Sequence, residues 1–254
     1  MLTSDEIDQY HQDGYVVPRS FRLPAAVLES IKTRHAALLA QHPEFRDYCP
    51  ALFNHDAGFL DYGSNRAILD RVEQLIGPDI ALWNMSFFAK PAGNGKRTPW
   101  HQDGEYWPIR PLATCTAWLA VDDSTVENGC LRVIRGSHKD RALKAHNTVH
   151  STDVTLNQEL DADAFDPARA VDITLEAGQI SLHDVYLLHG SEANTSPKSR
   201  RGMTIRFMPT TSVFDRAIAR EKAERIGGTD HSNRQIYLLR GTDRSGRNTF
   251  TNIR

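Results

Sequence analysis

Two short strings in this sequence place a histidine and an aspartate two positions apart, a spacing that can hold a metal ion. The second string, His101-Gln102-Asp103, is expected at the beginning of a strand, where residues i and i+2 point to the same face. The first, His11-Gln12-Asp13, lies in a helical pattern, where residues two apart diverge by about 200°. We therefore expect a metal site at the second string and a helix end at the first.

A third ligand must come from elsewhere in the chain, and His189 is the candidate. It follows the apolar run 179–188, and we expect it to end this strand at the mouth of the sheet. Two histidines and one carboxylate on one face leave three coordination positions open, as in non-haem Fe(II) oxygenases. The set His101, Asp103 and His189 therefore predicts an iron site.

Arg200 lies eleven residues beyond His189 and can return on the next strand of a hairpin to face the same cavity. Arginine binds a carboxylate through two parallel hydrogen bonds, and Ser191 can add a hydroxyl donor beside it. A dicarboxylate can be anchored there. Arg201 is either an exposed salt-bridge partner or exchanges this role with Arg200. Strand alternation puts Arg200 and Arg206 on one face.

The elements that must position these residues form one domain in three parts. Residues 1–78 are expected to contain helices at 3–14, 24–41 and 65–76, from a capping box and from apolar residues at helical spacing. Residues 79–210 are expected to form a β-rich core with a polar insertion near 138–170, and residues 211–254 a C-terminal extension with a helix and a mobile tail. The expected strand runs are 80–90, 113–122, 131–134, 171–175, 179–188 and 202–208. This order predicts a mainly β fold, a jelly roll with N-terminal helices packed on one sheet.

Composition excludes several classes of partner. The 254 residues carry a formal net charge of −2, which gives no long-range attraction to nucleic acid or to an anionic membrane. The three cysteines form no CxxC spacing, so we expect no disulfide framework and no thiolate zinc site, and a reducing cytoplasm suits them. The chain shows neither an export signal nor a run of about 18 apolar residues. Its oligomeric state is not readable from the sequence.

Four blocks of sequence resemble the phytanoyl-CoA dioxygenase family of Fe(II)/2-oxoglutarate oxygenases. In order, and spread over most of the chain, they are TSDEIDQYHQDGYVV, FFAKPAGNGKRTPWHQDGEYW, TAWLAVDDSTVENGCLRVIRGSHK and LLHGSEANTSPKSRRGMTIRF. The resemblance implies a double-stranded β-helix, the cupin-like jelly roll, which agrees with the strand pattern. It also implies a dioxygenase that uses Fe(II), 2-oxoglutarate and O2 and acts on a small molecule.

The resemblance assigns roles to particular residues. It implies that His101, Asp103 and His189 bind iron. It also implies a pocket for 2-oxoglutarate, with Arg200 as carboxylate anchor and with further contacts from Ser191, Trp118 and Ser86. Relatives that halogenate carry alanine or glycine at the position of Asp103, so this carboxylate favours hydroxylation of an unactivated C–H bond.

The substrate pocket has weaker candidates, and two other functions remain open. Tyr106 and Trp107 either wall the pocket or pack beside the sheet, Asn84 shares a face with Ser86, and Arg206 either holds an anionic substrate group or forms a buried ion pair. Arg206 and Arg110 favour an acidic or zwitterionic metabolite. The alternatives are a metal-dependent enzyme of the same fold without 2-oxoglutarate, and a non-catalytic binding protein.

Overall fold

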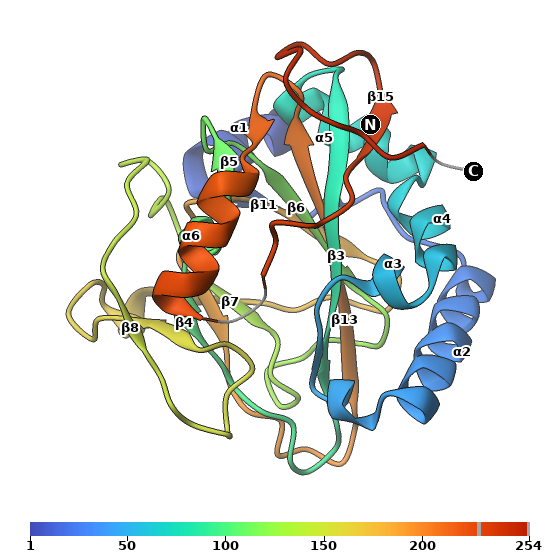
Figure 1. The fold of residues 1–254 in the computed structure, drawn as a ribbon. Helices are drawn as coiled ribbons and strands as arrows, with labels where there is room; N and C mark the ends of the chain where they lie inside the picture. The colour runs from blue at the N-terminus through green and yellow to red at the C-terminus, as the bar shows by residue number, and fades with distance from the viewer. Residues whose placement is uncertain (228–229, 253–254) are drawn as a thin grey trace.

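The computed structural model of the protein describes residues 1–227 and 230–252, and two antiparallel β-sheets form its centre (Figure 1). Their strands are β1 (Tyr15–Val16), β2 (Tyr48–Cys49), β3 (Ile80–Lys90), β4 (Thr98–His101), β6 (Cys115–Ala120), β7 (Leu131–Ile134), β10 (Ala170–Ile173), β11 (Ile180–Asp184), β12 (His189–Ser191), β13 (Arg200–Pro209) and β15 (Tyr237–Arg240). Within the described residues, the larger sheet runs β1-β11-β6-β13-β3-β15, with β2 also paired to β3. The smaller sheet runs β10-β7-β12-β4.

Helices cover one face of the larger sheet, on the right and at the top of Figure 1. They are α1 (Ser4–Asp13), α2 (Ala25–Gln41), α3 (Leu52–His55), α4 (Leu60–Gly63) and α5 (Arg66–Ile76). Their apolar side chains share one core with alternate residues of β13, namely Met203, Ile205 and Phe207. The mainly β fold with N-terminal helices packed on one sheet is confirmed. No helix in the described part of the chain is long and apolar enough to cross a membrane.

Local capping explains where the first helices begin and end. The hydroxyl of Thr3 accepts a hydrogen bond from the backbone N–H of Glu6, and the carboxylate of Glu6 accepts one from the N–H of Thr3. Gly14 ends α1 at a φ of 83°, in the left-handed region that glycine adopts without strain. The first His-Gln-Asp string is therefore a helix end, as predicted. The side chain of Asn65 caps the beginning of α5, where it accepts hydrogen bonds from the backbone N–H groups of residues 67 and 68.

The prediction of one strand over 179–188, ended by His189, is wrong. Strand β11 ends at Asp184, whose backbone carbonyl accepts a hydrogen bond from Leu187 at 3.1 Å and whose carboxylate accepts one from Tyr186 at 2.8 Å. This turn carries the chain from the larger sheet to the smaller one, where His189 begins β12. The turn continues the apolar pattern because Val185 and the two leucines that follow Tyr186 are buried.

Two polar segments contain strands that the sequence did not indicate. The insertion 138–170 contains a hairpin of β8 (His146–Thr148) and β9 (Gln158–Leu160). After α6 (Arg216–Ile226), the C-terminal extension that we expected to end in a mobile tail contains β15, which pairs with β3. Arg240 at the end of β15 makes ion pairs with Asp70 and Glu73 of α5. These contacts span about two thirds of the chain, so no local pattern could have indicated them.

His35 of α2 makes the stability of the fold depend on pH. Its ring is 3% exposed and stacks on Phe87, with 4.1 Å between the ring centroids. Its Nε2 atom has no hydrogen-bond partner among the residues that the structure describes. Burial, together with the charge of Arg201, lowers the pKa of His35 from 6.5 to about 4. The unfolded chain therefore binds a proton between these values and the folded chain does not, so stability is lost as the pH falls through this window.

We expect His35→Leu to reduce this acid sensitivity. Between about pH 7.5 and pH 5, the free energy of unfolding of the wild type should fall by about 2 kcal/mol more than that of the variant. Urea unfolding of both proteins at the two pH values measures the difference. Equal pH dependence in the two proteins would show that His35 does not titrate as described.

Candidate metal centre and active site

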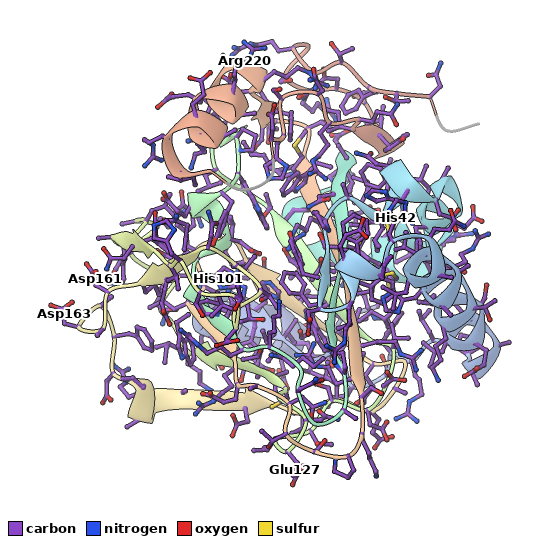
Figure 2. The ribbon with its side chains drawn as sticks, turned by 60° about the horizontal axis from the view of Figure 1, so that its bottom comes forward. His42, His101, Glu127, Asp161, Asp163 and Arg220 are labelled. Atoms are coloured by element: carbon purple, nitrogen blue, oxygen red, sulfur yellow. The ribbon has the colours of Figure 1, made fainter. Side chains whose placement is uncertain are left out.

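Three polar side chains converge in the interior between the two sheets. His101 is the last residue of β4, His189 the first of β12, and the two are directly paired across the strands. Asp103 begins a 3-10 turn, η3 (Asp103–Glu105), instead of the strand that the sequence predicted. Its Oδ1 atom lies 3.6 Å from Nε2 of His101 and 3.9 Å from Nε2 of His189. All three are buried, with ligand atoms within 4.8 Å of one another, and Figure 2 shows His101 among the interior side chains.

Backbone carbonyls fix both imidazole rings. Nδ1 of His101 lies 2.8 Å from the carbonyl oxygen of Pro99, and Nδ1 of His189 lies 2.9 Å from that of Leu187. A proton on Nδ1 satisfies each carbonyl and leaves the Nε2 lone pair directed toward Asp103. Burial and the neighbouring His101 hold the pKa of His189 well below its usual value, so this ring is neutral. Two neutral imidazole nitrogens and one carboxylate oxygen fit a divalent iron ion and leave positions open.

The second carboxylate oxygen of Asp103 faces two further side chains. Its Oδ2 atom accepts a hydrogen bond from the hydroxyl of Thr116 at 3.5 Å and lies 3.6 Å from Nε2 of His183. Burial raises the pKa of Asp103, but the neighbouring imidazoles of His101, His183 and His189, together with the charge of Arg206, outweigh it and hold the pKa well below its usual value. The carboxylate is therefore ionised, which is the form that binds a metal.

Helix α6 holds the turn that carries Asp103. Lys222 is 8% exposed and donates hydrogen bonds from Nζ to the backbone oxygens of Gly104 and Glu105. Arg225 reaches the carboxylate of Glu105 at 3.4 Å. Because these contacts join residues more than 100 positions apart, the C-terminal part of the chain helps to place a candidate metal ligand.

A cavity beside the triad is lined by Arg200, Ser191 and Trp118, the residues expected to hold a cosubstrate. Arg200 is 1% exposed and donates to the carbonyl oxygens of Phe88 at 2.9 Å and Gly129 at 2.7 Å. Its guanidinium carbon lies 5.1 Å from the ring centroid of Trp118. Burial lowers the pKa of Arg200 to about 10, which still leaves it charged at neutral pH. A fixed cation without a carboxylate partner among the described residues is suited to bind an anion.

Arg201 faces away from this cavity. It donates two hydrogen bonds to the carboxylate of Asp122, at 2.7 and 2.8 Å, on the other face of β13. Of the two neighbouring arginines, Arg200 is therefore the one that borders the triad.

The same region of the chain matches a known family. A model of the family described as Phytanoyl-CoA dioxygenase (PhyH) matches residues 10–202, which contain the three converging residues and Arg200. The chain belongs to the PhyH family.

Individual relatives extend this result. The protein called phytanoyl-CoA dioxygenase domain-containing protein 1 homolog of Caenorhabditis briggsae is 34% identical over 148 residues, 55% of this chain and 51% of its own length. The homolog from Caenorhabditis elegans is 33% identical over 217 residues, 81% of this chain and 73% of its own length. The chain thus spans about half the length of the first relative. The solved structure of apo ThoJ, a non-heme monooxygenase, is similar with a TM-score of 0.73 at 26% identity, over 96% of this chain and 86% of that one.

The remaining predicted residues of this PhyH chain fall into two groups. Four of them line a second cavity that also reaches Asp103, namely Asn84, Tyr106, Trp107 and Arg206. Ser86 lines neither cavity, and its hydroxyl accepts a hydrogen bond from Nη1 of Arg206 at 2.8 Å, so it supports that arginine. Arg110 also lines neither cavity and donates to the backbone oxygens of residues 107 and 109. The structure therefore does not support the prediction that Arg110 contacts the substrate.

Two residues near the site were not recognised in the sequence. Lys90, the last residue of β3, is 1% exposed and pairs directly with Arg200 across β3 and β13. Burial and the charge of Arg200 lower its pKa to about 6. His183 lies opposite Thr116 in the pairing of β11 with β6, and only the register of this pairing could have placed His183 beside Asp103. The register is a long-range property and is not visible in a local pattern.

Gly202 permits the position of Trp118 in this PhyH pocket. A Cβ atom at residue 202 would lie 2.1 Å from Cζ2 of the indole, far inside van der Waals contact. We expect Gly202→Ala to displace the ring, to cost about 1–3 kcal/mol of stability and to weaken 2-oxoglutarate binding. Urea unfolding and a 2-oxoglutarate titration followed by tryptophan fluorescence measure the two effects. Wild-type values in both would show that Trp118 does not need this space.

Proposed function

We propose that this PhyH-family chain is an Fe(II)- and 2-oxoglutarate-dependent dioxygenase that hydroxylates an unactivated C–H bond of a small molecule. The observation that carries the proposal is the convergence of His101, Asp103 and His189 within 4.8 Å, next to the guanidinium of Arg200, which has no carboxylate partner among the described residues. Two imidazoles and a carboxylate leave room for further ligands, and the adjoining cation suits the distal carboxylate of 2-oxoglutarate. The names of the relatives, which refer to a dioxygenase and a non-heme monooxygenase, agree with it.

The residues of the chain have separable roles in this proposal. His101, Asp103 and His189 hold the iron, and the carbonyls behind the imidazoles keep Nε2 turned toward it. Arg200 and Ser191 orient the cosubstrate through its carboxylate, while Trp118 restricts the space beside it and keeps water out. When bound, iron and 2-oxoglutarate activate O2 with release of succinate and CO2, which supplies an oxidant for C–H bonds. Asp103 occupies a position that a halide would need, and this favours hydroxylation over halogenation.

The setting of the enzyme is part of the same proposal. Cys49, Cys115 and Cys130 are free and buried. Burial raises the pKa of each thiol, which keeps it protonated and unreactive. Free thiols of this kind are compatible with the reducing, cytoplasmic environment that we propose.

Anaerobic addition of Fe(II) and 2-oxoglutarate tests the proposal directly. We expect a visible charge-transfer band, followed after admission of O2 by release of succinate. Absence of the band in a protein that binds iron would favour a metal-dependent enzyme that does not use 2-oxoglutarate. Absence of iron binding altogether would favour a non-catalytic binding protein.

A further inference from the structure

The cavity that reaches Asp103 from the far side of the triad is enclosed by parts of the chain that are distant in sequence. It has a volume of about 210 Å³ and shares Phe88, Asp103 and Arg206 with the cavity that contains Arg200. Its walls come from β2, β3, the turn after β4 and residues 155–157 of the insertion, while His231 comes from the C-terminal segment. A molecule in this cavity would therefore lie against the iron site.

Buried cations gather at this cavity. Arg206 borders it directly and is 4% exposed, and Arg234, also 4% exposed, lies behind Asn84. Arg206 donates to the hydroxyl of Ser86 at 2.8 Å, and Arg234 donates to the side-chain oxygen of Asn84. Both acceptors are neutral. Neither arginine has an ion-pair partner among residues 1–227 and 230–252, and the Nε atom of each lacks a hydrogen-bond partner there.

This arrangement is costly unless an anion binds. Burial of an unpaired cation costs several kcal/mol, and two such cations at close range also repel each other. Both effects are visible in Arg234, since burial and the charge of Arg206 lower its pKa to about 10. Burial, and after it the charges of Arg234 and Arg206, hold the pKa of His231 well below its usual value. The sequence left open whether Arg206 forms a buried ion pair, and its hydrogen bond to neutral Ser86 gives no support to that alternative.

A carboxylate held at Arg200 does not account for these charges. Arg200 and Arg206 are six residues apart on β13, which corresponds to about 20 Å along a strand. The carboxylate that Arg200 anchors therefore lies far from Arg206 along the strand, although both side chains border one cavity. Arg206 also lines the second cavity, where its charge and that of Arg234 behind Asn84 are available to an anionic group of another molecule.

We infer that this cavity binds the anionic group of the substrate, which is a carboxylate, a phosphate or a phosphonate. Arg206 contacts this group directly, while Arg234, hydrogen-bonded to Asn84, adds a second positive charge behind the cavity wall. The inference rests on the proposed function, because it describes the substrate of the same iron site. The cavity is smaller than the 300–1,000 Å³ typical of drug-sized ligands, so the substrate is a small metabolite. Arg206 and Asp103 both border this cavity, so a substrate whose anionic group is held by Arg206 presents a nearby carbon to the iron.

Direct binding is the first test. The protein is loaded anaerobically with Fe(II) and 2-oxoglutarate so that Arg200 is occupied, and acetate, methylphosphonate and inorganic phosphate are titrated by calorimetry. We expect at least one of them to bind, and Arg206→Gln to weaken it about tenfold or more. Arg234→Gln should weaken it less, and Arg234→Lys should regain part of the loss because it keeps the charge. Arg71→Gln is the matched control, since Arg71 is also buried but donates to a backbone carbonyl on α5.

Kinetics provide the second test and separate a binding role from a structural one. Metabolites with an anionic group and their neutral amides or esters are compared by succinate release. The anionic members should stimulate turnover, and Arg206→Gln should raise the KM for the substrate about tenfold or more while the KM for the cosubstrate changes less than about twofold. Equal stimulation by the neutral members, or an unchanged substrate KM in both Arg206→Gln and Arg206→Lys, would overturn the inference.

The two proposals fail in different ways. A wild type that shows the charge-transfer band but binds none of the three anions overturns the anion site and leaves the oxygenase intact. A wild type that binds an anion through Arg206 without showing the band supports the anion site and contradicts the oxygenase. Comparison of the wild type with Arg206→Gln by calorimetry therefore has a result even when the enzyme is inactive.

Discussion

Replacement of His101 by alanine should remove iron binding and with it all succinate release. The imidazole supplies one of the three donors found among the described residues, and its loss leaves Asp103 and His189 as an incomplete set. Changes to residues that merely support metal ligands already cost about 10–100-fold in affinity, so we expect a loss of more than about 100-fold here. Anaerobic titration of Fe(II) in the presence of 2-oxoglutarate, followed by the visible band, measures it.

The chain contains its own control for this experiment. His11 occupies the first position of the other His-Gln-Asp string, but it is exposed on helix α1. His11→Ala should bind iron as the wild type does, because residues two apart on a helix point in different directions. If the two variants bound iron equally well, His101 would not be a ligand.

Replacement of Arg200 by glutamine should weaken 2-oxoglutarate binding by about 30-fold or more. Truncation of one partner of a buried charge pair costs about 2–5 kcal/mol, and each 1.4 kcal/mol corresponds to about a factor of ten. Arg200 is buried and held by two backbone carbonyls, so water does not substitute for its guanidinium when the side chain is truncated. The KM for the cosubstrate and a titration of the visible band measure the loss, while iron affinity in the absence of 2-oxoglutarate should be unchanged.

The neighbouring residue provides the comparison. Arg201→Gln removes the same charge from the adjacent position of β13, but its partner is the partly exposed Asp122. Such a pair contributes about 1 kcal/mol or less to stability, and its loss should leave 2-oxoglutarate binding as it is. A larger effect on cosubstrate affinity in Arg201→Gln than in Arg200→Gln would reverse the assignment of the anchor.

Features that depend on neighbouring residues could be predicted from the sequence. The capping box at Thr3, the Asn65 cap and the apolar spacing fixed the helices to within a residue or two. Alternation along β13 placed Arg200 and Arg206 on the face of the sheet that borders the cavities. Each of these features follows from backbone geometry over a few positions, which is why a single sequence is sufficient to show it.

Features that depend on pairing between distant segments could not be predicted. The apolar run before His189 is the same whether it is one strand or a strand followed by a buried turn, and only the second sheet decides between them. His183 approaches Asp103 only through the register of β11 with β6, and Arg234 approaches the cavity only because β15 pairs with β3. Local periodicity contains no information on these registers.

The C-terminal segment also bears on how such an enzyme can change its target. The match to the PhyH family ends at residue 202, whereas Arg206, His231 and Arg234 follow it. In the functions proposed above, the iron ligands and the arginines that bind the substrate's anionic group are thus encoded in successive stretches of the gene and meet only after folding. Substitutions or exchanges within residues 206–252 could retarget the enzyme while its iron chemistry is inherited unchanged, provided that Lys222 is retained to hold the turn at Asp103.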